Sequence, residues 1–157
     1  MKHFSSPEDL LSHIGQDLGV SPWRTVNQAT IDAFARDTGD DNWIHVDTAR
    51  AARELPGGKT IAHGFLTLAL TVALAREVFS VGGVARAVNY GVDGLRFTAP
   101  VPADSRIRLR LMVKQAERRA DGAIRVVLGS TVEVDGQTRP AAVFDKLALL
   151  YPEPGAA

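Results

Sequence analysis

The sequence predicts an α+β domain in which a curved antiparallel sheet wraps around one long, apolar central helix. Three observations support this class. Helix-type segments come first along the chain and strand-type segments follow. Residues from Gly64 to about Phe79 show no polar face before Arg76 and Glu77, as expected of a helix buried in a core. Residues 105–118 alternate between apolar and charged side chains, which is the period of a half-exposed strand.

The first half of the chain carries several helix signals. Residues 6–15 predict a first helix with Ser6 as its N-cap, and "SPW" after it suggests a loop or short strand. Residues 27–39 predict a second helix, capped by Asn27 and ended by Gly39. The segment "VDTARAARELPGG" predicts a short helix that a Pro-Gly-Gly run interrupts. The long apolar helix from Gly64 follows.

Turn residues divide the second half into strands. Asp121-Gly122 and Asp135-Gly136 separate residues 105–118, 123–134 and 138–151, which predicts an antiparallel meander. Residues 83–101 supply one or two more strands, and the tail "PEPGAA" is expected to be loose. A sheet wrapped around one helix leaves open edges, so we expect pairing with a second copy, most simply as a homodimer.

Composition excludes several classes of protein. The 157 residues suit a single domain, 1–157, and 18 basic against 18 acidic residues give no net charge, unlike a nucleic-acid-binding protein. The absence of cysteine rules out disulfides and thiolate chemistry and suits a reducing cytosol. The N-terminus lacks a signal-peptide pattern, and the uncharged run from Phe65 to Ala75 is shorter than the ~20 residues that span a bilayer. We therefore expect a cytoplasmic protein with no membrane partner.

The segment "TGDDNWIH", Thr38–His45, concentrates chemically active side chains. In a helix, Asp40 and His45 would lie about 140° apart and could not meet, but Gly39 and the Asp-Asp-Asn run favour a turn. In a turn the two side chains can converge, with His45 as a base near neutral pH and the carboxylate orienting it or sharing its proton.

Simpler interpretations of this segment remain open. It could be a solvated turn with an incidental histidine. A metal site of Asp40, Asp41, His45 and Asp47 is less favoured, because the four histidines show no zinc-type spacing. A nucleophilic serine is also disfavoured, since the chain contains no G-x-S-x-G motif.

The segment "IAHGFLTLAL" also allows two interpretations. Gly64 could simply permit close packing where the buried helix begins. Alternatively, its backbone N–H, unpaired at a helix N-terminus, could bind a developing oxyanion. His63 is expected to be a core or supporting histidine.

Three stretches together resemble a known family: "TGDDNWIHVDTARAA", "TIAHGFLTLAL" and "NYGVDGLRFTAPVPADS". They are similar to the MaoC-like dehydratases, including the (R)-specific enoyl-CoA hydratases, and most of all to the nodulation-protein-N-like branch. The likeness covers about residues 23–151. Trp43 replaces the usual proline, Ala69 replaces a serine found in some hydratases, and Ala103 replaces a glycine.

The resemblance implies a hot-dog fold and a hydro-lyase of fatty acid metabolism without cofactor or metal. Its substrate would be a trans-2-enoyl or (R)-3-hydroxyacyl thioester of CoA or acyl carrier protein. Asp40 and His45 would form the catalytic dyad and Gly64 would bind the thioester oxygen. Asn42 would be a substrate-binding residue together with Gly64, but its main role would be to stabilise the turn between Asp40 and His45. Two alternatives are a hot-dog acyl-CoA thioesterase and a non-catalytic protein that binds acyl thioesters.

Overall fold

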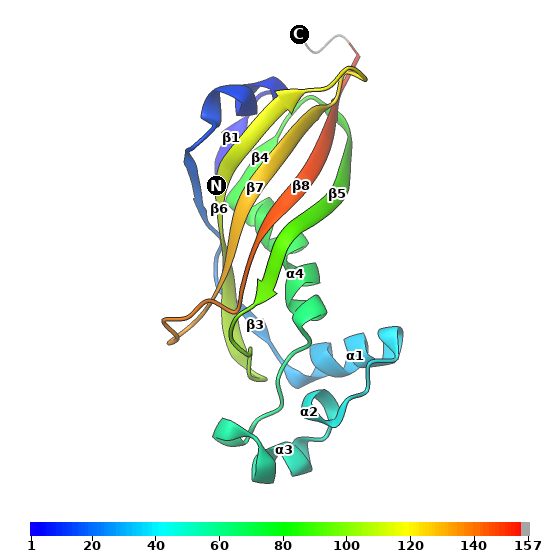
Figure 1. The fold of residues 1–157 in the computed structure, drawn as a ribbon, viewed down its shortest axis with the longest axis vertical. Coiled ribbons are helices and arrows are strands. Elements are labelled where there is room, and N and C mark those ends of the chain that lie inside the picture. Colours follow the sequence, from blue (N-terminus) through cyan, green and yellow to red (C-terminus); the bar gives the residue numbers. More distant parts are fainter. Residues whose placement is uncertain (155–157) are drawn as a thin grey trace.

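The computed structural model describes residues 1–154, which form a curved antiparallel sheet with one long helix against it and three short helices beyond its end (Figure 1). In chain order the elements are β1 (Lys2–Phe4), η1 (Pro7–His13), β2 (Asp17–Val20), β3 (Arg24–Val26), α1 (Gln28–Thr38), α2 (Trp43–Val46), α3 (Thr48–Glu54), η2 (Pro56–Gly58), α4 (Gly64–Val78), β4 (Phe79–Val81), β5 (Val84–Phe97), β6 (Ser105–Arg118), β7 (Ile124–Val134) and β8 (Ala142–Pro152).

The predicted meander is present. The main sheet has the order β2-β6-β7-β8-β5, and β3 also pairs with β6. All of its strand pairs are antiparallel. The turns that join β6 to β7 and β7 to β8 contain Gly122 at φ 83° and Gly136 at φ 75°, a backbone region that glycine enters without a steric penalty. Residues 83–101 contain one long strand, β5 (Val84–Phe97), rather than two.

Strand β5 forms one edge of this sheet. It pairs with β8 on one side and with no other strand among residues 1–154. Most of its side chains are exposed, including Tyr90 at 54% and Phe97 at 43% of their maximum. A long edge with exposed aromatic residues is the kind of surface that pairs with another chain.

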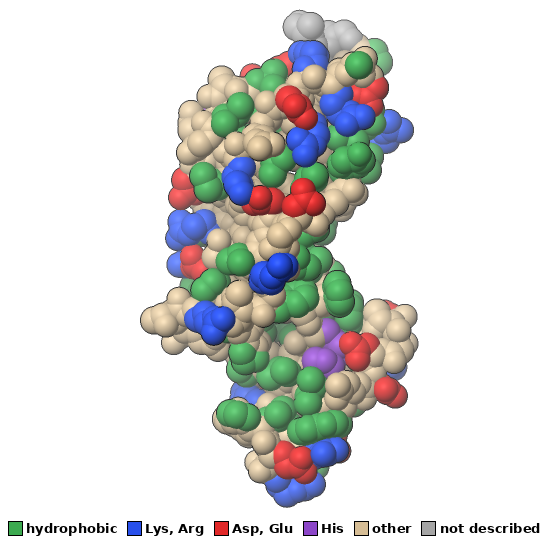
Figure 2. Space-filling model, viewed as in Figure 1, with side chains coloured by type: hydrophobic (Ala, Val, Ile, Leu, Met, Phe, Trp, Pro, Cys, Tyr) green, Lys and Arg blue, Asp and Glu red, His purple; other side chains and the backbone are tan. Residues whose placement is uncertain are grey.

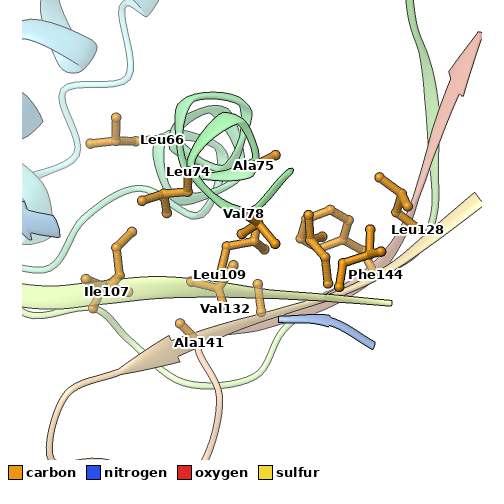
Figure 3. Close-up of a cluster of buried hydrophobic side chains, with 14 of the residues drawn as sticks. Leu66, Leu74, Ala75, Val78, Ile107, Leu109, Leu128, Val132, Ala141 and Phe144 are labelled. Carbon is orange, nitrogen blue, oxygen red and sulfur yellow. The ribbon is translucent and has the colours of Figure 1, made fainter. Parts of the chain in front are cut away.

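Helix α4 packs on the concave face of the sheet (Figure 3). Leu66, Leu74 and Val78 lie opposite Ile107 and Leu109 of β6, and all five are buried. Full burial of such a side chain contributes about 1.5–3 kcal/mol, so this contact is a main source of stability.

The expectation that α4 is buried on all sides is wrong for the single chain. Phe65 is 65% exposed and Ala69 is also exposed. One sheet can cover only one side of a helix. The opposite side of α4, which is also apolar, is therefore exposed to solvent in the single chain.

Local signals predicted most, but not all, of the remaining elements. The first helix is a 3-10 helix, in which the Asp9 carboxylate accepts hydrogen bonds from the backbone N–H groups of Ser5 and Ser6. Strands β1, β2 and β4 were not predicted, because each has only three or four residues and depends on distant pairing partners. Of the tail expected to be loose, residues 155–157 lie outside the described part. Within residues 1–154, no helix is both long and apolar enough to cross a membrane.

Candidate functional site

The Thr38–His45 segment runs from the last residue of α1 into α2, beyond the end of the sheet (Figure 1). Helix α1 stops where Gly39 adopts a left-handed conformation, φ 74°, and Asp40 follows directly. The side chain of Asn42 then caps α2 by accepting a hydrogen bond from Ile44 N at 3.4 Å. Trp43 stacks on the Arg50 guanidinium at 3.9 Å, which ties α2 to α3. The predicted turn is therefore present at residues 39–42, but helix α2, which was not predicted, begins at Trp43 and includes His45.

His45 is held in one orientation inside α2. The residue is only 8% exposed, and its Nδ1 lies 2.6 Å from the backbone oxygen of Ile61. A carbonyl oxygen can only accept, so the neutral ring carries its proton on Nδ1. Nε2 then keeps a lone pair, as a general base requires.

The Asp40 side chain converges on the same place. Asp40 is exposed, and its carboxylate lies within 4.8 Å of ring nitrogens of both His45 and His63. One water molecule with hydrogen bonds of about 2.8 Å can bridge such a gap. The geometry thus allows a water to be shared by Asp40 and His45.

His63 supports both of these residues. It is 2% exposed, and its Nε2 donates a hydrogen bond to the backbone oxygen of Asp40 at 2.9 Å. Its ring stacks on that of His45, with centroids 3.8 Å apart and planes 28° from parallel. Its Nδ1 is buried and has no hydrogen-bond partner within residues 1–154. Sequence reasoning gave His63 only a general supporting role, and the structure shows direct contact with both members of the pair.

Gln28 is a supporting residue that the sequence did not reveal. Its Nε2 donates to the backbone oxygen of His45 at 2.8 Å and to the Asp32 carboxylate at 2.7 Å. Its Oε1 accepts a hydrogen bond from the buried hydroxyl of Thr60. One side chain at the start of α1 therefore links α2 to the segment that leads into α4. No local pattern identifies such a residue, because its partners are distant in sequence.

A cavity of about 310 Å³ adjoins His45. Figure 2 shows histidine side chains at the narrow waist between the sheet and the α1–α3 end, beside acidic side chains. Gly64 lines this cavity together with Phe97, and a Cβ built on Gly64 would lie only 2.6 Å from the Phe97 ring. Phe97 can therefore pack this closely only because Gly64 has no side chain. The remaining walls are formed by Ile61, Ala62, Thr67, Thr98, Ala99, Pro100, Val101 and Ala141.

The same cluster does not suit a metal ion. Asp40, His45 and His63 are close enough together to be considered as ligands. However, a metal lies about 2.0–2.1 Å from a ligating nitrogen, near the plane of its ring. Two stacked rings 3.8 Å apart cannot both direct a lone pair at one ion in that way. The arrangement fits acid–base chemistry on a bound water better than metal ligation.

Comparison with known proteins agrees with this architecture. A family model described as a MaoC like domain matches residues 9–135. The 3-hydroxyacyl-thioester dehydratase Z of Mycobacterium tuberculosis (strain ATCC 25618 / H37Rv) is 43% identical over 147 residues, covering 94% of this chain and 97% of the relative. Nodulation protein N of Rhizobium leguminosarum bv. viciae is 40% identical over 153 residues, covering 97% of this chain and 95% of the relative.

A solved structure shares the fold as well. The R-hydratase PhaJ1 of Pseudomonas aeruginosa, in its unliganded form, superposes with a TM-score of 0.72 at 25% identity, over 89% of this chain and 83% of that one. The predicted hot-dog fold is thereby confirmed. The chain belongs to the MaoC-like dehydratase family.

Proposed function

We propose that this protein catalyses the (R)-specific hydration of trans-2-enoyl thioesters and the reverse dehydration of (R)-3-hydroxyacyl thioesters. The observation that carries the proposal is the convergence of the Asp40 carboxylate and the His45 ring, within 4.8 Å of each other, beside an apolar cavity. The names of the relatives, a 3-hydroxyacyl-thioester dehydratase and an R-hydratase, support the reaction class and its stereochemistry.

In the proposed hydration, Asp40 and His45 hold one water molecule between them. His45 Nε2, which keeps its lone pair because Nδ1 bonds to the Ile61 carbonyl, removes a proton as the water oxygen bonds to C3. The C2–C3 double-bond electrons move toward the thioester and place negative charge on its oxygen. The Asp40–His45 pair then returns one proton to C2, so H and OH are added and the enzyme is unchanged.

The developing negative charge needs a donor, and Gly64 supplies one. It is the first residue of α4, where backbone N–H groups have no partner within the helix, and it lines the cavity beside His45. Removing one such donor typically costs about 2.7–4 kcal/mol of transition-state stabilisation, or roughly 10²–10³-fold in rate.

The partners follow from this chemistry. The substrate would be an acyl thioester of CoA or of acyl carrier protein. A second copy of the chain would cover the apolar open side of α4 and the exposed edge of β5, giving a homodimer.

The test is crotonyl-CoA hydration, followed by loss of enoyl absorbance. We expect Asp40→Asn and His45→Gln to lower kcat by about 10²–10⁴-fold while the melting temperature stays near that of the wild type. Asp41→Asn is the matched control, because Asp41 is an exposed neighbouring carboxylate with no hydrogen bond among the described residues. Near-normal turnover in either dyad variant would refute the assignment. Thiol release in place of absorbance loss would indicate a thioesterase, and binding without turnover would indicate a non-catalytic binding protein.

A further inference from the structure

The ring of His63 lies face to face with the ring of the proposed base, His45. The two ring centroids are 3.8 Å apart, and the ring planes are 28° from parallel. Both residues are buried in the single chain. Among residues 1–154, His63 supplies the one aromatic ring that packs against His45, while Phe34 contacts His63 from α1 with 5.0 Å between ring centroids. The stacked contact is thus complete without a second copy of the chain.

The surroundings of the His63 ring favour its neutral form. Its Nε2 donates a hydrogen bond to the backbone oxygen of Asp40 at 2.9 Å, so the proton of the neutral ring lies on Nε2. Its Nδ1 is buried and has no hydrogen-bond partner within residues 1–154. A second proton on Nδ1 would be a buried donor without an acceptor, which is unfavourable. His63 therefore presents the face of an uncharged aromatic ring to His45.

The proposed hydration, on which the following inference rests, places a positive charge on His45. Nε2 of His45 takes a proton from the attacking water and the ring is an imidazolium until a proton returns to C2. Because His45 is buried, water cannot fully solvate this cation. The Asp40 carboxylate approaches a ring nitrogen of His45, but Asp40 is exposed, so solvent weakens its attraction. The ring face that His63 covers is shielded from water.

We propose that His63 is a positioning residue that stabilises the imidazolium form of His45 through its ring face. The negative face of an aromatic ring attracts a cation within about 6 Å of its centroid, and the attraction is stronger where water is excluded. The stacked pair, at 3.8 Å, lies well inside this range. His63 would therefore act on both members of the pair, since its Nε2 holds the Asp40 backbone and its ring face supports the charge on His45.

An NMR titration of the His45 ring tests the proposal without requiring turnover. We expect the titration midpoint of His45 to lie about 0.5–1 pH unit higher in the wild type than in His63→Gln, which keeps a hydrogen-bond donor but has no ring. His63→Phe keeps an aromatic face but has no donor, and its midpoint should lie above that of His63→Leu, which has neither. His13 is the internal control, because it packs against Phe4 of β1, away from the α1–α3 end, and should titrate alike in every variant (Figure 1).

The pH profile of crotonyl-CoA hydration adds a kinetic readout. The titratable groups that face the His45 ring are Asp40, from the turn after α1, and His63, whereas the neutral Gln28 contacts the backbone oxygen of His45. In His63→Gln the acidic limb of kcat/KM should move to lower pH by the same 0.5–1 unit or so, because His45 then loses its proton more easily. The plateau should fall, because a weaker base removes the proton from water less readily. A purely structural defect would lower the plateau and leave the limb in place.

Two results would overturn the proposal. One is a His45 midpoint that is the same in the wild type and in His63→Gln. The other is a folded His63→Phe whose midpoint equals that of His63→Leu. If thermal unfolding shows that His63→Phe does not fold, the comparison of the wild type with His63→Gln decides alone. Shifted midpoints in a protein that does not hydrate crotonyl-CoA would refute the hydratase assignment and leave the interaction between the two rings established.

Discussion

Replacing Gly64 with alanine places a methyl group against the ring of Phe97. The added Cβ would lie 2.6 Å from two ring carbons, whereas carbon atoms in contact are normally about 3.5–4.0 Å apart. The ring must therefore withdraw by about 1 Å. Overpacking of this kind typically costs about 1–3 kcal/mol, and the lower end applies because Phe97 is 43% exposed and has room to move. For a chain of this length we expect the melting temperature to fall by about 3–6 °C.

The catalytic effect should be larger than the effect on stability. Gly64 and Phe97 both line the cavity beside His45, and a displacement near 1 Å at a reacting centre can cost about 10²-fold in rate. We therefore expect kcat/KM for crotonyl-CoA to fall about 10²-fold in Gly64→Ala.

A double-mutant cycle with Phe97→Ala tests the physical cause. In the Phe97→Ala background the methyl group added at position 64 has space, so the stability cost of Gly64→Ala should largely disappear. Thermal unfolding and the hydration assay are measured for both single variants and the double variant. An equal loss of melting temperature in both backgrounds would show that the Phe97 ring is not the source of the crowding. Unchanged turnover in Gly64→Ala would refute the predicted displacement at the reacting centre.

Three further predictions concern two residues that act through their neighbours, Gln28 and His63, and one partly buried cation, Lys146. Gln28→Leu leaves the buried Thr60 hydroxyl and the His45 carbonyl without their partner. It should cost about 1–3 kcal/mol in urea unfolding and lower kcat with little change in KM, and an unchanged kcat would refute its positioning role. His63→Leu removes the hydrogen bond to the Asp40 carbonyl and should lower kcat at least about tenfold, whereas His63→Gln, which keeps a donor, should retain more activity; equal rates would contradict this. Lys146→Met tests the electrostatic cost of a cation beneath α4. Burial lowers the pKa of Lys146 below the usual 10.5, and the nearby charge of Arg76 lowers it further. The folded chain therefore holds the proton of Lys146 less tightly than the unfolded chain does. The charge on Lys146 therefore destabilises the folded chain fully at neutral pH, and this destabilisation decreases as pH rises through the pKa of Lys146 in the folded state. The stability of Lys146→Met minus that of the wild type, from urea unfolding, should therefore be largest near pH 7 and shrink toward pH 10, and a difference independent of pH would contradict the argument.

Local patterns in the sequence were sufficient for the frame of this fold. Alternation along β6, Asp-Gly turns and the Asn27 and Gly39 caps identified the meander and α1, because each acts within a few residues. The same local chemistry placed a turn between Asp40 and His45 and so made their convergence a reasonable prediction. The start of the apolar helix offered Gly64 as a possible oxyanion donor, and the family resemblance favoured that role; Gly64 does line the cavity beside His45. The catalytic roles of these residues remain predictions.

The tertiary structure alone decided how the site is held together and what surrounds it. His63 reaches Asp40 across 23 residues of sequence, and Gln28 reaches Thr60 across 32. The Phe97 ring fills the space beside Gly64, one side of α4 stays open, and Lys146 and Arg76 share a cavity without an acidic partner among the described residues. Sequence patterns report interactions between near neighbours along the chain, whereas these contacts exist only once the sheet, α4 and the short helices have packed in three dimensions.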